Sequence, residues 1–122
     1  MGLAVDRRME TSTTTGTGNV TVAGAVVGYK TLVGGKIEVN KFFDYVIEAV
    51  DASGVPTGEW ETGEGYLTTS TVLVRQVVYE SSNADALVNF SAGTKRVFIT
   101  LSGAEVQDKG QQVARALYLS MN

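Results

Sequence analysis

The chain has 122 residues, which is enough for one domain with a single modest hydrophobic core. Its composition, 43% hydrophobic and 19% charged with a net charge of -3, excludes a disordered chain and argues against nucleic acid as the main partner. The sequence has no histidine and no cysteine, which excludes a His-dependent catalytic triad, a thiolate metal site and a disulfide framework.

Residues 1–18 are predicted to form an extended N-terminal arm. The first ten residues are charged and lack the apolar stretch of a signal peptide. No apolar run approaches the roughly 18 residues that span a bilayer, so we expect a soluble protein made in the cytoplasm. Residues 11–18 are threonine-rich and broken by glycine, which suits neither a helix nor a core strand. The arm is either a loose terminus or a segment that pairs with a neighbouring subunit, where Arg7 and Arg8 would contact carboxylates.

The residues after the arm predict two strands and a short third segment. In residues 19–23, Val20 and Val22 alternate with a polar position, which is typical of a half-buried strand. Residues 26–33 predict a second strand after a glycine turn. Residues 37–39 form either a short strand or part of a loop.

The most regular strand is predicted for residues 43–49. Its apolar residues fall on one face and its carboxylates on the other, because side chains alternate across a strand. The apolar face comprises Phe43, Tyr45, Ile47 and Ala49, and the other face carries Asp44 and Glu48.

A turn cluster at residues 51–58 separates this strand from two more. The first of these strands, residues 59–63, alternates between polar and apolar or small side chains. We therefore expect Trp60 to point into the core and Glu59 and Glu61 to point outward. Residues 71–80 are mostly apolar on both faces, which predicts a central strand or a strand at a subunit contact.

The apolar runs of residues 86–90 and 95–101 flank a turn that contains glycine, which predicts a β-hairpin. The second run is apolar through its centre without alternation, so both of its faces should be covered and Phe98 should lie in the core. Lys95 and Arg96 open this strand, and we interpret them as a solvated edge that discourages unwanted pairing.

Residues 102–122 are predicted to form a short C-terminal helix. Ser102, followed three residues later by Glu105, fits the capping-box pattern. An apolar stripe follows at near-helical spacing and packs either on its own domain or on a partner. The stripe consists of Val106, Val113, Leu117 and Met121.

These elements predict a single all-β domain, an antiparallel sandwich or barrel. The 14 glycines and 1 proline indicate many turns, and β-branched residues dominate the remainder. The predicted organisation is an arm at residues 1–18, a β domain at residues 19–101 and a C-terminal segment at residues 102–122.

The sequence selects no catalytic, cofactor or metal site. Glu59, Glu61 and Glu64 form a carboxylate cluster, but no aspartate-rich calcium loop accompanies them, so we interpret them as a solvated strand face. The glycine-rich stretches lack the P-loop lysine and the dinucleotide fingerprint. A small hydrolase that uses serine and lysine is a remote alternative, although nothing selects a particular pair.

Several short motifs occur together between residues 6 and 101. They are Asp6-Arg7 with Glu10-Thr11, residues 13–18 (TTTGTG), Ala23-Gly24-Ala25, residues 59–61 (EWE) with Gly63, Leu73 with Arg75, residues 81–83 (SSN), and residues 88–95 (VNFSAGTK) with Val97-Phe98. Each motif is weak alone, but in combination they resemble a small β module of tailed-bacteriophage virion proteins. This module occurs in the N-terminal regions of tail-fibre-like proteins and in short stand-alone virion proteins.

The resemblance implies a structural or attachment role in a virion and no chemistry. No fibre shaft or receptor-binding tip follows the motifs, so we expect a tail or fibre-attachment adaptor, with a capsid decoration protein as the alternative. We expect a homo-oligomer in the virion, made in the host cytoplasm, that contacts other virion proteins and has no cofactor, nucleic-acid partner or membrane partner. The candidate partner contacts are Arg7, Arg8, Glu10, Thr13, Thr15, Val113, Leu117 and Met121.

Overall fold

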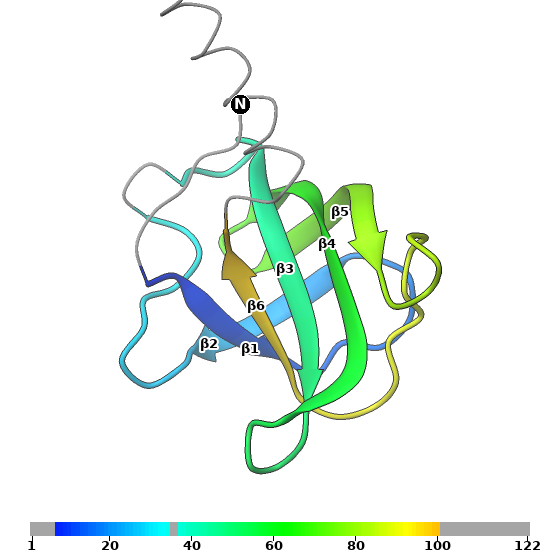
Figure 1. The fold of residues 1–122 in the computed structure, drawn as a ribbon. Coiled ribbons are helices and arrows are strands. Elements are labelled where there is room, and N and C mark those ends of the chain that lie inside the picture. The colour runs from blue at the N-terminus through cyan, green and yellow to red at the C-terminus, as the bar shows by residue number, and fades with distance from the viewer. Residues whose placement is uncertain (1–6, 35–36, 101–122) are drawn as a thin grey trace, which may run out of the picture.

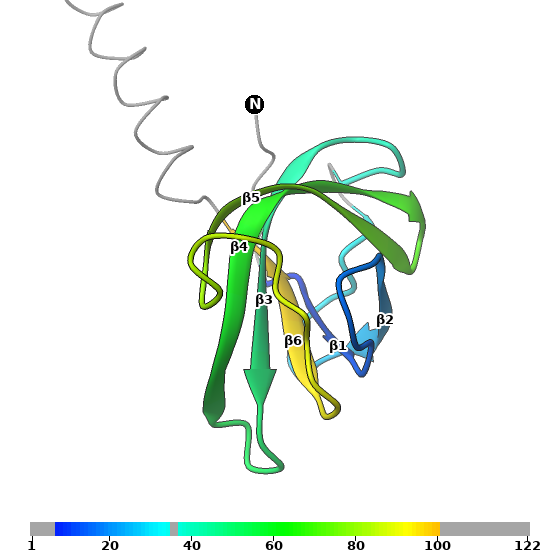
Figure 2. The same cartoon turned by 90° about the vertical axis from the view of Figure 1, so that its right-hand side faces the viewer.

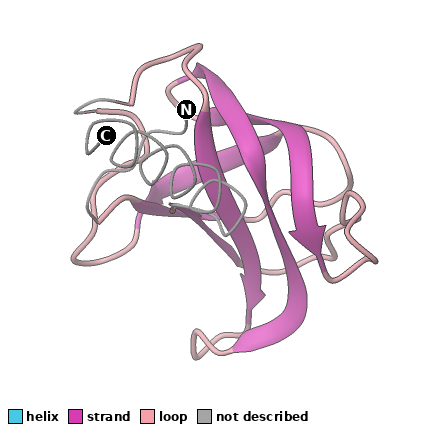
Figure 3. Cartoon of the chain, turned by 45° about the horizontal axis from the view of Figure 1, so that its top comes forward, coloured by secondary structure: helices cyan, strands magenta, loops and turns pink. Residues whose placement is uncertain are grey.

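A computed structural model describes residues 7–34 and 37–100, and every regular element in these ranges is a β-strand (Figures 1 and 3). The strands are β1 (Met9–Ser12), β2 (Val20–Ala25), β3 (Phe43–Val50), β4 (Pro56–Thr69), β5 (Val72–Ser81) and β6 (Lys95–Ile99). The prediction of an antiparallel all-β domain is confirmed. Within the described ranges, no helix has the length and apolarity that crossing a membrane requires.

The six strands pair antiparallel in the cyclic order β1-β2-β5-β4-β3-β6, so the sheet closes as a barrel (Figures 1 and 2). Strand β1 closes the cycle, because Glu10 pairs with Ala25 of β2 on one side and with Val97 of β6 on the other. The junction between β2 and β5 is short and consists of the pairs Val20–Leu73 and Thr21–Val72.

Strand β3 forms one wall of the core and agrees with the alternation in its sequence. The predicted inward residues are all buried, as are the inward positions of the neighbouring β4 and β6. Gly63 and Gly65 of β4 leave room for the ring of Tyr45, because a side chain at Gly63 would meet the Tyr45 hydroxyl at 2.8 Å and the Val77 carbonyl oxygen even closer. The two glycines therefore allow a large aromatic ring inside a small barrel.

Loop residues complete the hydrophobic core. Leu32, Ile37, Val88 and Phe90 lie outside the strands and are almost fully buried. The core consists of Val20, Val22, Leu32, Ile37, Phe43, Tyr45, Ile47, Leu67, Leu73, Val88, Phe90, Val97 and Ile99.

The prediction of an extended arm is wrong for residues 9–12, which form β1 within the barrel. The polar side chains of this strand are satisfied internally. The Glu10 carboxylate accepts hydrogen bonds from the backbone amides of Gly24 (3.0 Å) and Leu32 (2.9 Å), and the Ser12 hydroxyl donates to the Thr21 carbonyl (2.7 Å). A strand with a polar sequence is therefore stable inside the barrel, because its buried groups keep hydrogen-bond partners.

Two further sequence predictions are corrected. Residues 26–33 form turns instead of a strand, since Tyr29 donates back to the Val26 carbonyl and Gly28 takes a positive φ of 85°. Residues 86–90 do not form a hairpin with β6, which lies between β1 and β3 instead. Phe90 makes only an isolated bridge to Gly16. The predicted C-terminal helix at residues 102–122 lies outside the described residues.

The assignment of core residues also changes in β6 and β4. Val97 and Ile99 point into the barrel, while Phe98, predicted in the core, is only partly buried. Trp60 is likewise partly buried on β4. The register explains β6, because Val97 pairs with the buried Ile47 and an inward position on one strand faces an inward position on the next.

Strand β5 offers a matched test of this inside-outside assignment. Leu73 is fully buried, whereas Val77 on the same strand is 46% exposed. Leu73→Ala is expected to lower the free energy of unfolding by about 2–5 kcal/mol because it leaves a cavity in the core. Val77→Ala is expected to change it by less than about 0.5 kcal/mol. Urea unfolding measures both values, and equal effects would contradict the assignment.

Candidate functional site

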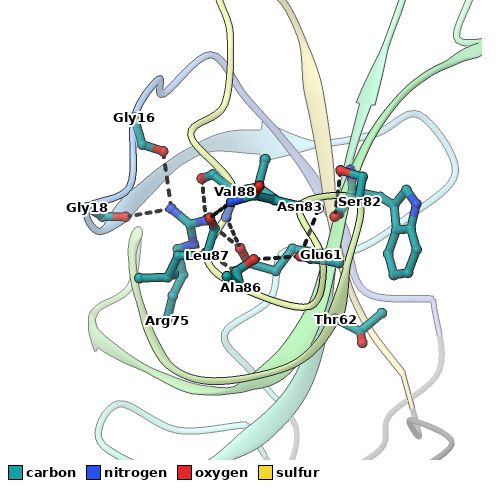
Figure 4. Close-up of polar contacts among 12 residues, drawn as sticks. Gly16, Gly18, Glu61, Thr62, Arg75, Ser82, Asn83, Ala86, Leu87 and Val88 are labelled. Atoms are coloured by element: carbon teal, nitrogen blue, oxygen red, sulfur yellow. Dashed lines mark hydrogen bonds and ion pairs between the residues drawn. The ribbon is translucent and has the colours of Figure 1, made fainter.

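A buried ion pair between β4 and β5 is the main polar site of the described residues. Glu61 and Arg75 both point into the barrel, with side chains that are 0% and 1% exposed. Arg75 Nε donates to Glu61 Oε2 at 2.8 Å, and Arg75 Nη2 donates to Glu61 Oε1 in a second, shorter contact. This two-point geometry fixes both side chains, because a guanidinium fork matches a carboxylate (Figure 4).

Two more donors complete the hydrogen bonding of the carboxylate. The Tyr45 hydroxyl donates to Glu61 Oε2 at 2.6 Å, and the Val88 backbone amide donates to Glu61 Oε1 at 2.9 Å. Burial raises the pKa of the Tyr45 hydroxyl well above its ordinary value, and the neighbouring Glu61 carboxylate raises it further. Tyr45 therefore remains a protonated donor.

The remaining donors of Arg75 hold two loops against the barrel. Nη1 donates to the carbonyls of Gly16 (3.2 Å) and Gly18 (3.3 Å), and Nη2 donates to the Val88 carbonyl (2.7 Å). All five N–H donors of the guanidinium are thus satisfied. The loops before β2 and β6 are joined to β5 by one side chain, next to the short junction between β2 and β5 (Figure 4).

The lysine that opens β6 belongs to a second polar cluster. Lys95 was predicted on a solvated edge, but it is only 2% exposed, and its Nζ donates to the carbonyls of Ser91 and Gly93. The Ser91 amide and hydroxyl donate to the Glu59 carboxylate at 3.0 and 2.7 Å. Burial lowers the pKa of Lys95, partly opposed by Glu59. The cluster fixes the turn before β6, and it directs the serine hydroxyl toward Glu59 rather than toward the lysine amine.

The pKa of Glu59 gives a test of this cluster. It lies below the ordinary value of 4.5, because the Ser91 amide and hydroxyl donate hydrogen bonds to the carboxylate. Ser91→Ala removes the hydroxyl donor, so it is expected to raise this pKa toward 4.5, as measured by NMR titration. The wild-type contacts stabilise the fold above pH 4.5, and this contribution is lost as the pH falls through the lower folded-state pKa. Ser70→Ala, on an exposed turn, is the control.

The predicted contact residues of the arm fall into different environments. Arg7 Nε donates to the Gly28 carbonyl at 3.0 Å, and its guanidinium lies 4.4 Å from the centre of the Tyr29 ring. Arg8 Nη1 donates to the Thr31 carbonyl at 3.0 Å. Glu10 is 2% exposed, so it is corrected from a partner contact to an internal residue. Thr13 and Thr15 are exposed, and Val113, Leu117 and Met121 lie outside the described residues.

The interpretation of the carboxylate cluster as a solvated face is wrong for Glu61. Glu61 pairs across the sheet with the buried Ile47, which places its side chain inside. The sequence signal that could have found it is Arg75, a charge that directly follows three apolar residues in a mostly apolar strand. Such a charge requires a buried partner. In the part of the chain that the structure describes, no group of three or more histidine, cysteine, aspartate or glutamate side chains is arranged to hold a metal ion.

No family model matches the sequence, and neither a curated protein nor a solved structure matches it. Four of the seven motifs compared above with phage virion modules contribute residues to these two clusters. Residues 13–18 supply the carbonyls of Gly16 and Gly18, residues 59–61 supply Glu61, and the motif at residues 88–95 supplies Val88. Sequence motifs that lie far apart in the chain therefore form one connected unit.

Proposed function

We propose that this protein is a non-enzymatic structural component of a tailed-bacteriophage virion, acting as an adaptor in the tail or at the fibre attachment site. The convergence of four of the seven resemblance motifs on the pair of Glu61 and Arg75 carries this proposal. Motifs whose residues hydrogen-bond to one another are expected to occur together in a sequence. Chance matches would instead be scattered over unrelated parts of the fold. The contacts among the four motifs support treating those four as one set.

The chemistry of the cluster supports a structural role. Both oxygens of Glu61 accept two hydrogen bonds each, and every donor of Arg75 is used within the chain. A fully satisfied buried network rigidifies a fold and specifies one arrangement of its loops. Rigidity of this kind suits a protein that transmits force or position between other proteins.

The proposed contacts with other virion proteins are the exposed loop that follows β1 and the C-terminal segment at residues 102–122. Thr13 and Thr15 are exposed on the loop that follows β1. In this proposal residues 102–122 form a helix, and Val113, Leu117 and Met121 contact a neighbouring protein. The protein would be made in the host cytoplasm and incorporated into the particle, without a nucleic-acid or membrane partner.

Copy number in purified virions tests the proposal. Quantitative mass spectrometry of the phage particles that contain this protein is expected to find about six or twelve copies, the number for a tail or collar position. Hundreds of copies would instead assign it to capsid decoration. Absence from purified particles, with the protein present in infected cells, would contradict both virion roles.

A further inference from the structure

A groove lies at the end of the barrel where β3 finishes. It has a volume of about 350 Å³ and lies between the turn after β2 and the turn that joins β3 to β4. Its apolar wall includes Val26, Val27 and Ala52. Val27 is 97% exposed at this wall, so its side chain is accessible to a partner.

The groove also contains two charged groups with free hydrogen-bonding capacity. The Arg96 guanidinium lines the groove and makes no hydrogen bond or ion pair with any residue that the structure describes. Asp51 lines it as well, and its Oδ1 accepts from the amides of Ser53 and Val55 at 2.8 and 2.9 Å. Its Oδ2 makes no hydrogen bond among the described residues. The groove therefore presents one cation and one anion beside an apolar wall.

The loop that precedes β3 presents the complementary groups. Lys41 and Glu38 form an ion pair at 3.8 Å, and their side chains are 60% and 66% exposed. Val39 and Phe42, on the same loop, are 39% and 45% exposed. Strand β3 has 8 residues, roughly 23 Å of extended chain, and it separates this loop from the groove, so the two lie at opposite ends of the barrel (Figure 1).

We propose that the groove binds residues 38–42 of a second copy of this chain, so that copies associate head to tail. Glu38 of one copy would pair with Arg96 of the next, and Lys41 with Asp51, while Val39 packs near Val27. Two pairs of opposite charge and one apolar contact together fix the orientation of the loop.

Head-to-tail contact joins two different surfaces of the same protein. Such contacts form rings when the rotation between copies closes and filaments when it does not. The proposed interface makes a second copy of this chain one of the partners in the virion. It rests on the proposed virion role, because that role places several copies in one particle. Failure of self-association would leave the copy number in virions unaffected, so the two proposals can be separated.

Charge reversal tests the interface on the full-length protein by sedimentation velocity. The wild-type protein is expected to self-associate with a dissociation constant of about 1 mM or lower. Arg96→Glu and Glu38→Arg are each expected to raise the dissociation constant by at least about tenfold, because each places like charges together. An equimolar mixture of the two variants should recover self-association with alternating copies, because the reversed groove of one variant pairs with the reversed loop of the other and their unchanged groove and loop also pair.

Glu80→Arg is the matched control for Glu38→Arg. It replaces the same residue type by the same residue type on the exposed surface of β5, and it should leave self-association unchanged. Circular dichroism checks that each variant is folded, and Glu38→Arg changes an exposed side chain. A wild-type protein that remains monomeric would overturn the proposal. Sensitivity to Arg96→Glu without sensitivity to Glu38→Arg would also overturn it, since the groove would then bind a different segment of the second copy.

Discussion

A chain that lacks residues 1–18 is expected to lose its cooperative folding. The deletion removes β1, which opens the barrel and leaves β2 and β6 each with an unpaired edge. It also removes the Gly16 and Gly18 carbonyls that accept from Arg75. Because a domain of this size is stable by only about 5–15 kcal/mol, the loss of a complete strand should exceed what the remainder can tolerate. Thermal unfolding followed by circular dichroism should show no sigmoidal transition.

The matched control for this deletion is a chain that begins at Arg7. It keeps every contact described for β1, including both hydrogen bonds to the Glu10 carboxylate. This shorter deletion is expected to unfold cooperatively. The prediction would be refuted by a chain of residues 19–122 that unfolds with the same midpoint as the wild type, because β1 would then contribute nothing to the barrel.

Local alternation made much of the sheet predictable from sequence. The strands around Val20 and Tyr45 have apolar residues at every second position, and the strand around Leu73 is mostly apolar on both faces; their predicted ranges agree with β2, β3 and β5. The period of two is a local property, so it needs no knowledge of which strands pair. The turns that reverse the chain after β2 and before β6 are also marked by glycine, as at Gly93.

The polar residues inside the barrel could not be placed by the same reasoning. Glu10, Glu61 and Lys95 are almost fully buried, although a charged side chain is normally taken to point outward. Each is buried because distant segments bring hydrogen-bond partners to it: Glu10 meets the Leu32 amide 22 residues away and Glu61 meets the Val88 amide 27 residues away. Register between distant strands decides these positions, and a single sequence does not contain it in readable form.

The same limit explains why β1 was assigned to an arm. Its four residues carry one apolar side chain, Met9, so no hydrophobic pattern marks them as a strand. Their stability in the barrel comes from main-chain pairing with two neighbours and from internal hydrogen bonds of Glu10 and Ser12. Conversely, local pattern predicts Trp60 in the core from the alternation around it and Phe98 from the apolar run around it, whereas the register turns both side chains toward the outer face.

Arg75→Met is expected to lower the free energy of unfolding by about 3–5 kcal/mol. Methionine keeps much of the apolar volume, so the main cost arises because the Glu61 carboxylate remains buried without its cation. The change also leaves the carbonyls of Gly16, Gly18 and Val88 without a donor. Urea unfolding of the variant measures the loss, and amide hydrogen exchange should rise in both loops that the guanidinium holds.

The exposed pair of Glu38 and Lys41 provides the control, because its charges stay solvated. Lys41→Met is expected to change the free energy of unfolding by less than about 0.5 kcal/mol. The double variant Glu61→Leu with Arg75→Met should recover part of the loss, since no buried charge is left unpaired. Full recovery is not expected, because the Val88 amide and the loop carbonyls still lack partners. Equal costs for Arg75→Met and Lys41→Met would show that the buried pair does not hold the loops to the barrel.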